Sequence, residues 1–215
     1  MIAGVRVKVC GITRPEDAAA ALRVGADVLG LITYPKSPRY VDRDRFSGLA
    51  DEIGWERVVV VSVSPSINDL EKWRAQGART FQIHFSADTP LPVIQSWSQT
   101  VGPDHLWLAP KLPAGSRVVN GWLPLTGAFL FDGYAPDKFG GTGTTSDWDN
   151  FALHRKTYPA KTWILSGGLG PDNVAPALAR TKAAFIDVNS GVEARPGIKD
   201  EAKLEALATA VSGAR

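Results

Sequence analysis

The sequence KVCGIT, at residues 8–13, decides the fold because it joins an extended segment to a turn and a helix start. Before the turn, valines alternate with Arg6, Lys8 and Cys10, which is the period-two pattern of a strand with two different faces. A glycine then allows the chain to change direction. The pattern predicts a strand over residues 5–10 that ends at the only cysteine of the chain.

The residues after this strand predict the start of a helix. Thr13 and Glu16 have the spacing of a capping box, in which both side chains bond free backbone amides. We expect a helix over 15–24 that ends at Gly25. In parallel α/β proteins the chemistry lies where a strand feeds a helix, so Cys10 is a candidate functional residue. A buried cysteine that packs as a small hydrophobic residue is the alternative, and position alone leaves both open.

The strand-then-helix pattern recurs along the chain. Apolar, β-rich segments predict strands near residues 5–10, 26–33, 58–63, 79–84, 105–110, 128–132, 162–166 and 184–188. Helices are expected near residues 15–24, 43–53, 67–76, 88–98, 114–121, 148–156, 171–181 and 200–212. This alternation predicts one α/β domain over residues 1–215, a parallel eight-stranded (β/α)8 TIM barrel. The alternative is an open doubly wound sheet, which usually has about five or six strands.

Prolines make the prediction of two of these strand–helix units less regular. The fifth unit is the weakest, because Pro110 and Pro113 follow its strand-like residues at once. In the seventh helix, Pro171 suits a first turn, where its missing amide has no partner. Pro176 lies deeper and removes a backbone donor, so this helix is expected to be short or kinked.

Composition bounds the class of protein. The chain has 215 residues, of which 44% are hydrophobic and 21% charged, as in ordinary soluble globular proteins. A net charge of +2 is too small to favour nucleic acid or an anionic membrane as partner. A single cysteine excludes an internal disulfide and fits a reducing compartment. Without a signal peptide or a long apolar run, the chain is expected to be cytoplasmic, with no membrane partner, metal or cofactor.

Several polar residues stand at or after the ends of predicted strands. Asp132 ends the sixth strand, where partial burial would raise its pKa and equip it as an acid; a cap or a structural hydrogen bond is the alternative. Arg39 lies in a loop stiffened by two prolines, and its guanidinium suits a carboxylate or phosphate, although most such loops bind nothing. His84 and Asp187 are candidate lining residues that could equally be structural.

Small residues follow the last two predicted strands. Gly167 and Gly168 follow the seventh strand, and Ser190 and Gly191 follow the eighth. Loops at these two positions often form a phosphate cradle in barrels, which we favour over plain tight turns. The GGTG segment that contains Gly141 is a weaker sign of a ligand, since it also suits a flexible lid or a simple turn.

A closed barrel would bring these candidates together. Strands one and six are three steps apart through strands eight and seven, so Cys10 and Asp132 would face each other across the mouth. The predicted phosphate cradle would lie between them. The arrangement places an acid and a base on opposite sides of an anchored sugar phosphate.

Taken together, these segments resemble the phosphoribosylanthranilate isomerase family of tryptophan biosynthesis. The combination is far more specific than any single motif, and it spans the chain in the order of the family. The matching segments are KVCGIT at 8–13, GADVLGL at 25–31, YPKSPRYV at 34–41, FD at 131–132, GGTG at 140–143, DW at 147–148, SGGLGPDNV at 166–174 and DVNSGVEARPGIKD at 187–200.

The resemblance implies an Amadori rearrangement of a small-molecule substrate, N-(5-phosphoribosyl)anthranilate, to 1-(2-carboxyphenylamino)-1-deoxyribulose 5-phosphate. It implies that Asp132 is the general acid, which opens the furanose ring, and that Cys10 is the general base, which removes the C2 proton. It also implies that Arg39 holds the anthranilate carboxylate and that the loops after the last two strands cradle the phosphate. Lys8, on the same strand face as Cys10, is expected to bind the substrate and to raise the thiolate fraction of that cysteine. A monomer and a homodimer are both open.

The sequence also departs from the usual family pattern. Ser62-Val63-Ser64-Pro65 replaces a Phe-Val-Asn type segment, Phe85 follows His84 where glycine is usual, and Ser146 stands where phenylalanine is usual. Two rival functions therefore stay open. One is a related isomerase of the histidine pathway, against which Cys10 argues, and the other is a non-catalytic barrel that binds phosphate.

Overall fold

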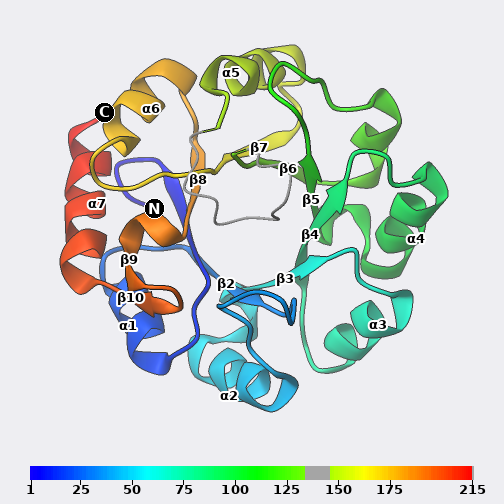
Figure 1. Ribbon diagram of the computed structural model, residues 1–215, viewed down its shortest axis with the longest axis horizontal. Helices are drawn as coiled ribbons and strands as arrows, with labels where there is room; N and C mark the ends of the chain where they lie inside the picture. The colour runs from blue at the N-terminus through cyan, green and yellow to red at the C-terminus, as the bar shows by residue number, and fades with distance from the viewer. Residues whose placement is uncertain (134–145, 215) are drawn as a thin grey trace.

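Eight parallel strands close into a barrel, with helices arranged around it (Figure 1). The computed structural model describes residues 1–133 and 146–214. The strand order is β1 to β8, and β1 pairs in parallel with both β2 and β8. The prediction of a (β/α)8 barrel is therefore confirmed, and an open sheet is excluded because no edge remains between the first and last strands.

The elements follow the predicted alternation closely. The barrel strands are β1 (Arg6–Cys10), β2 (Val28–Ile32), β3 (Val58–Val63), β4 (Thr80–Ser86), β5 (Leu106–Lys111), β6 (Ala128–Phe131), β7 (Thr162–Leu165) and β8 (Phe185–Val188). The α-helices are α1 (Pro15–Arg23), α2 (Arg43–Ile53), α3 (Ile67–Ala75), α4 (Leu91–Val101), α5 (Trp148–Thr157), α6 (Val174–Thr181) and α7 (Glu201–Gly213). Short 3₁₀ helices are η1 (Trp55–Arg57), η2 (Pro103–His105), η3 (Asn120–Leu125) and η4 (Ser190–Val192).

Every barrel strand except β4 contributes residues to two apolar layers. On β1, Val7 and Val9 join the large cluster between sheet and helices, whereas Cys10 joins a second cluster inside the barrel. The alternation along β1 therefore separates the faces as the sequence predicts. The interior cluster includes Trp107 and Phe185, whose rings pack edge to face with centroids 5.5 Å apart.

The predicted capping box is wrong. Arg14 is the N-cap of α1 and makes no side-chain cap, and the Thr13 hydroxyl instead donates a 2.5 Å hydrogen bond to the Gly197 carbonyl. The first helical residue is Pro15, which has no amide to cap. A partner 184 residues away thus outcompetes the local motif.

The predicted helix at 114–121 is also wrong. The chain bends there and forms η3 further on, because Gly115 has a φ of +75° and Pro124 lies inside η3. Helix α4 begins three residues later than the predicted start at 88, between two prolines that a first turn tolerates.

Helix α6 is short, at eight residues, as predicted, but not for the predicted reason. It begins at Val174, so Pro171 lies outside the helix rather than in its first turn, which corrects the prediction. Pro176 is the third residue of the helix, where a backbone amide has no intrahelical acceptor. It therefore removes no helical hydrogen bond.

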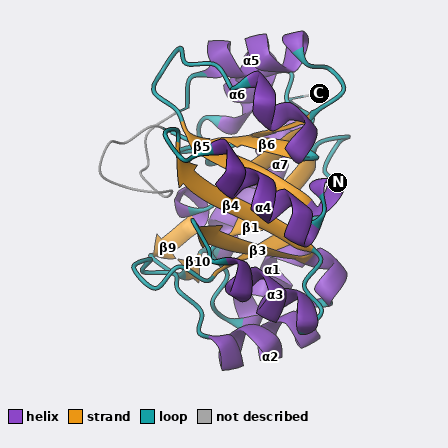
Figure 2. Cartoon of the chain, turned by 90° about the vertical axis from the view of Figure 1, so that its right-hand side faces the viewer, coloured by secondary structure: helices purple, strands orange, loops and turns teal. Residues whose placement is uncertain are grey.

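A small antiparallel hairpin, which the sequence did not suggest, follows the eighth strand. It consists of β9 (Glu193–Arg195) and β10 (Ile198–Lys199). Figure 2 shows this hairpin at one end of the barrel, with the N-terminus toward the other end. Among the described residues, no helix is long and apolar enough to cross a membrane, and no group of three acidic, histidine or cysteine residues could hold a metal.

Candidate active site

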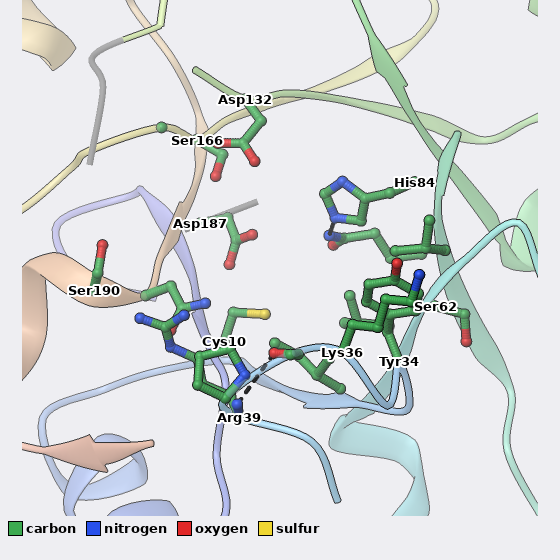
Figure 3. A pocket seen from close by; sticks show the side chains of 18 of the residues that line it. Cys10, Tyr34, Lys36, Arg39, Ser62, His84, Asp132, Ser166, Asp187 and Ser190 are labelled. Atoms are coloured by element: carbon green, nitrogen blue, oxygen red, sulfur yellow. Dashed lines mark hydrogen bonds between the residues drawn. The ribbon is translucent and has the colours of Figure 1, made fainter. Parts of the chain in front are cut away.

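A cavity of about 390 Å³ opens at the carboxyl ends of the strands, where parallel barrels carry their sites. Cys10, Arg39, His84, Asp132 and Asp187 all line it. Figure 3 shows the Asp132 and Asp187 carboxylates and the Cys10 thiol around the same hollow, with His84 on one side and Ser190 on the other. The fold thus brings together side chains from β1, β4 and β8 and from the segments that follow β2 and β6, which are far apart in the sequence.

The small residues after β7 and β8 sit at this mouth. Gly167, Gly168 and Ser190 line the cavity. Gly191 does not, and its role is to let the two loops interlock, because a Cβ there would collide with the Leu169 carbonyl. Close approach of backbone to backbone therefore explains Gly167 and Gly191, and a positive φ of +60° explains Gly168.

Two further predicted residues are not found among those that line the cavity. Lys8 is fully buried beneath the cavity rather than among the residues that line it. Gly141 lies outside the described residues.

Lys8 forms a buried ion pair with Asp187, with Nζ and Oδ1 3.0 Å apart, and it also interacts with the Cys10 thiol. Burial alone would lower the pKa of Lys8, but Asp187 and Cys10 outweigh it and hold that pKa above its usual value. Lys8 is therefore a permanent cation under the cavity floor. Gly30 on β2 makes room for it, since a Cβ would lie 2.8 Å from Cys10 Sγ and 3.0 Å from Lys8 Nζ. Sequence inspection missed Gly30, although a glycine inside a strand signals close approach of this kind.

The Cys10 thiol has a pKa above its usual value. Burial raises it, Lys8 lowers it and Asp187 raises it again. As predicted, Lys8 lowers the pKa of Cys10. Burial of the thiolate raises this pKa by more, so the net shift is upward. In the free protein, Cys10 is therefore mostly a protonated thiol near neutral pH.

The Asp132 carboxyl has a pKa raised to about 6. Burial is the main cause and Asp187 adds to it, whereas the Gly133 amide, which donates a 2.8 Å hydrogen bond to Oδ1, lowers the pKa. The sequence predicts that burial at the end of the sixth strand raises the pKa of Asp132, and the structure agrees with this direction. A carboxyl with this pKa keeps an available proton near neutral pH, as a general acid requires.

This shifted pKa predicts a stability effect. The folded pKa of Asp132, about 6, exceeds the reference value of 3.8, so ionisation destabilises the fold fully above pH 6 and not at all below about pH 4. We expect Asp132→Asn to increase the free energy of unfolding at pH 7 by on the order of 3 kcal/mol. Denaturant titrations at pH 7 and pH 4 test this: the gain should vanish at pH 4, and a gain of equal size at both values would contradict it.

His84 is a neutral imidazole. Burial, with a smaller contribution from Lys8, lowers its pKa to about 4. Its Nε2 lies 2.9 Å from the Gln82 side-chain nitrogen, which can only donate, so this pairing leaves the ring proton on Nδ1. The buried Gln82 Oε1 has no partner within the described part of the chain. His84 and Gln82 thus offer one donor and one acceptor to a ligand.

Arg39 is held by a buried carboxylate. Its Nε and Nη2 donate to Glu193 Oε1 and Oε2 at 2.8 and 2.6 Å. The sequence predicts a ligand-binding guanidinium here, but it gives no sign of this partner 154 residues away. Arg39 still lines the cavity, and among the described residues the edge that carries Nη1 is the one left for a ligand.

The family model and the curated relatives indicate one family. Residues 7–210 match the family described as N-(5'phosphoribosyl)anthranilate (PRA) isomerase. The N-(5'-phosphoribosyl)anthranilate isomerase of Neisseria gonorrhoeae is 36% identical over 215 residues, which are 96% of this chain and 96% of the relative. The crystal structure of phosphoribosyl anthranilate isomerase from Thermus thermophilus is 27% identical, with a TM-score of 0.80 over 98% of this chain and 100% of that one.

A further similar structure contains a bound ligand. It is a phosphoribosyl anthranilate isomerase in complex with reduced 1-(o-carboxyphenylamino)-1-deoxyribulose 5-phosphate. That protein is 26% identical to this chain, with a TM-score of 0.73 over 97% of this chain and 99% of that one.

Proposed function

The chain belongs to the N-(5'-phosphoribosyl)anthranilate isomerase family of tryptophan biosynthesis, and from this premise we propose which residues carry out the isomerisation. The general acid is Asp132 and the general base is Cys10. The observation that carries the proposal is that a carboxyl with a pKa of about 6 and the only thiol of the chain face one cavity. The interlocked loops after β7 and β8 line the same cavity and suit the substrate phosphate.

The first step opens the sugar ring. Protonated Asp132 donates to the furanose ring oxygen while the anthranilate nitrogen forms a double bond with C1, so the C1–O bond breaks and a Schiff base results. Because burial raises the pKa of Asp132 to about 6, roughly a tenth of the carboxyls remain protonated at pH 7, where an exposed aspartate would be almost fully ionised.

The second step moves a proton from carbon. The Cys10 thiolate removes the C2 proton, and the electrons shift toward the iminium nitrogen to give an enolamine, which tautomerises to the ketone. The buried Lys8 cation stabilises the thiolate directly, which offsets part of the penalty of burying that charge. Lys8 thus acts through Cys10 and Asp187 rather than by touching the substrate.

The remaining contacts orient the substrate. The guanidinium of Arg39 holds the anthranilate carboxylate with its free edge, and the loops that contain Gly167, Gly168, Ser190 and Gly191 hold the phosphate. His84 and Asp187 bond the sugar hydroxyls or the bridging nitrogen from the cavity wall. The reduced product bound in a related isomerase carries the same carboxyl and phosphate groups, which supports two anionic anchors.

The pKa values of the acid and base predict the pH dependence. The active form needs protonated Asp132 and Cys10 thiolate, although the thiol has the higher pKa. We therefore expect kcat/KM to rise about tenfold per pH unit up to about pH 6, to stay flat above it, and to fall beyond the pKa of Cys10. The measurement is fluorescence loss of N-(5-phosphoribosyl)anthranilate generated in situ, between pH 5 and pH 10.

The substrate phosphate also titrates, with a pKa of about 6, and a matched variant distinguishes its titration from that of Asp132. In Asp132→Asn, the residual kcat/KM should keep rising through pH 6, because the break that belongs to Asp132 is gone. If the break near pH 6 persists in this variant, it belongs to the phosphate, and Asp132 is not the acid.

A further inference from the structure

A buried cluster of three charged side chains lies beside the cavity and takes no part in the proton transfers. Glu193 Oε1 and Oε2 bind Arg39, and Oε1 also accepts a 3.1 Å hydrogen bond from Lys199 Nζ. All three side chains are less than one-tenth exposed. Glu193 and Lys199 both belong to the β9–β10 hairpin, which Figure 1 shows beside α1.

The cluster reaches the predicted phosphate loop. Lys199 Nζ donates to the Asn189 carbonyl at 3.2 Å and to Asn189 Oδ1 at 3.0 Å, and Asn189 directly precedes Ser190. One ammonium therefore joins the carboxylate that holds Arg39 to the loop that follows β8. A buried lysine of this kind fixes distances between groups because each of its donors is committed.

The same cluster packs against Gly11, the residue that follows Cys10 at the end of β1. Gly11 follows Cys10 with a φ of +74°, and a Cβ there would lie 2.6 Å from both Arg39 Cδ and Asn189 Oδ1. The two side chains thus converge over this one backbone position. Any movement of Arg39 or of the Asn189 loop would therefore change the packing around Gly11, which is the residue next to Cys10.

Glu193 also decides which edge of Arg39 is free. A guanidinium has five N–H donors in one plane, and Glu193 engages the edge formed by Nε and Nη2. The remaining fork, formed by Nη1 and the second Nη2 proton, has a fixed direction as long as the pair holds. Without Glu193, Arg39 could rotate, and it would share a buried space with the Lys199 cation unopposed.

We propose that Glu193 is a positioning residue that aims the free fork of Arg39 at the substrate carboxylate, and that Lys199 ties this pair to the phosphate loop. The distance between the two anionic anchors is then set by the hairpin. The inference rests on the proposed role of Arg39. Glu193 itself touches neither the substrate nor the reacting atoms.

The test compares ligands with and without a carboxyl group on full-length Glu193→Gln. We expect KM to rise about tenfold while kcat changes less than about threefold, because binding is lost equally in ground and transition states. The reduced product, 1-(o-carboxyphenylamino)-1-deoxyribulose 5-phosphate, should bind about tenfold more weakly. Its analogue with a phenylamino group should bind the variant and the wild type equally.

Asp149→Asn is the matched control. Asp149 holds Arg180 through the same Nε and Nη2 edge, but the pair lies exposed on α5 and α6. This variant should leave KM, kcat and both dissociation constants unchanged. A purely structural role of Glu193 would instead weaken both ligands alike, and tighter binding of the carboxylated ligand would mean that Glu193 competes for Arg39; either result overturns the proposal.

Two more variants keep the outcomes distinguishable. Arg39→Met should abolish the preference for the carboxylated ligand; if it does not, the role proposed for Arg39 is wrong, whatever Glu193 does. If Arg39→Met abolishes the preference and Glu193→Gln keeps it, only the positioning role fails. Should Glu193→Gln not fold, the double variant Glu193→Gln/Lys199→Met removes the unpaired cation and must lose the same preference.

Discussion

Cys10→Ala is expected to lower kcat/KM at least about a thousandfold, because the alanine leaves the C2 proton without a base. Cys10 is the only cysteine, and the other candidate bases among the described lining residues are poor substitutes: His84 is a weak base with a pKa of about 4, and Asp187 is paired with Lys8. The measurement is the fluorescence decay of substrate generated in situ, with enzyme concentration raised for the variant.

The fold should survive this change. Lys8 keeps its 3.0 Å partner Asp187, so no buried charge is orphaned, and only one sulfur atom is removed from the interior cluster. The reduced product should therefore bind the variant within a few-fold of wild type. Cys10→Ser provides the comparison, since a hydroxyl fits the site but ionises far less readily. If Cys10→Ala retains a tenth of the activity, the cysteine is a packing residue and the base lies elsewhere.

Asp132→Asn is expected to lower kcat at least about a thousandfold with little change in KM. The amide keeps the shape of the carboxyl and can still donate a hydrogen bond, but it has no proton to release to the ring oxygen. Ring opening then depends on water, which is a much weaker acid than a carboxyl group. Single-turnover decay of the substrate measures the step directly.

A helix-cap aspartate provides the control for this substitution. Asp200 accepts a hydrogen bond from the Lys203 amide at the start of α7. Asp200→Asn makes the same chemical change outside the cavity and should leave kcat at the wild-type value. If Asp132→Asn behaves like Asp200→Asn, the raised pKa of Asp132 serves some purpose other than proton donation.

Much of the fold is predictable because its signals are local. The alternation before Cys10 assigns side chains to two faces of one strand without knowledge of the rest of the chain. The predicted helix at 114–121 is wrong because proline and glycine set the backbone geometry there against the apolar pattern. The predicted capping box is wrong because the Thr13 side chain bonds the distant Gly197 carbonyl instead of a local amide.

The candidate site divides in the same way. Sequence placed Cys10, Asp132, Asp187 and the two glycine loops at strand ends, and parallel topology then brings every such end to one mouth. It did not indicate Glu193 as the partner of Arg39, nor Gly30 as the space beside Lys8. Those depend on which segments become neighbours once the barrel closes.

The sequence by itself determined the strand-and-helix alternation, the barrel, and the residue types that stand at its mouth, because periodicity and turn chemistry act over a few residues. Only the tertiary structure decided the ionisation of those residues. Lys8 and Asp187 are 179 positions apart, and their pairing, with burial from every surrounding strand, sets the pKa of Cys10 and contributes to that of Asp132. Burial and charge are sums over all neighbours in space, and no stretch of sequence contains them.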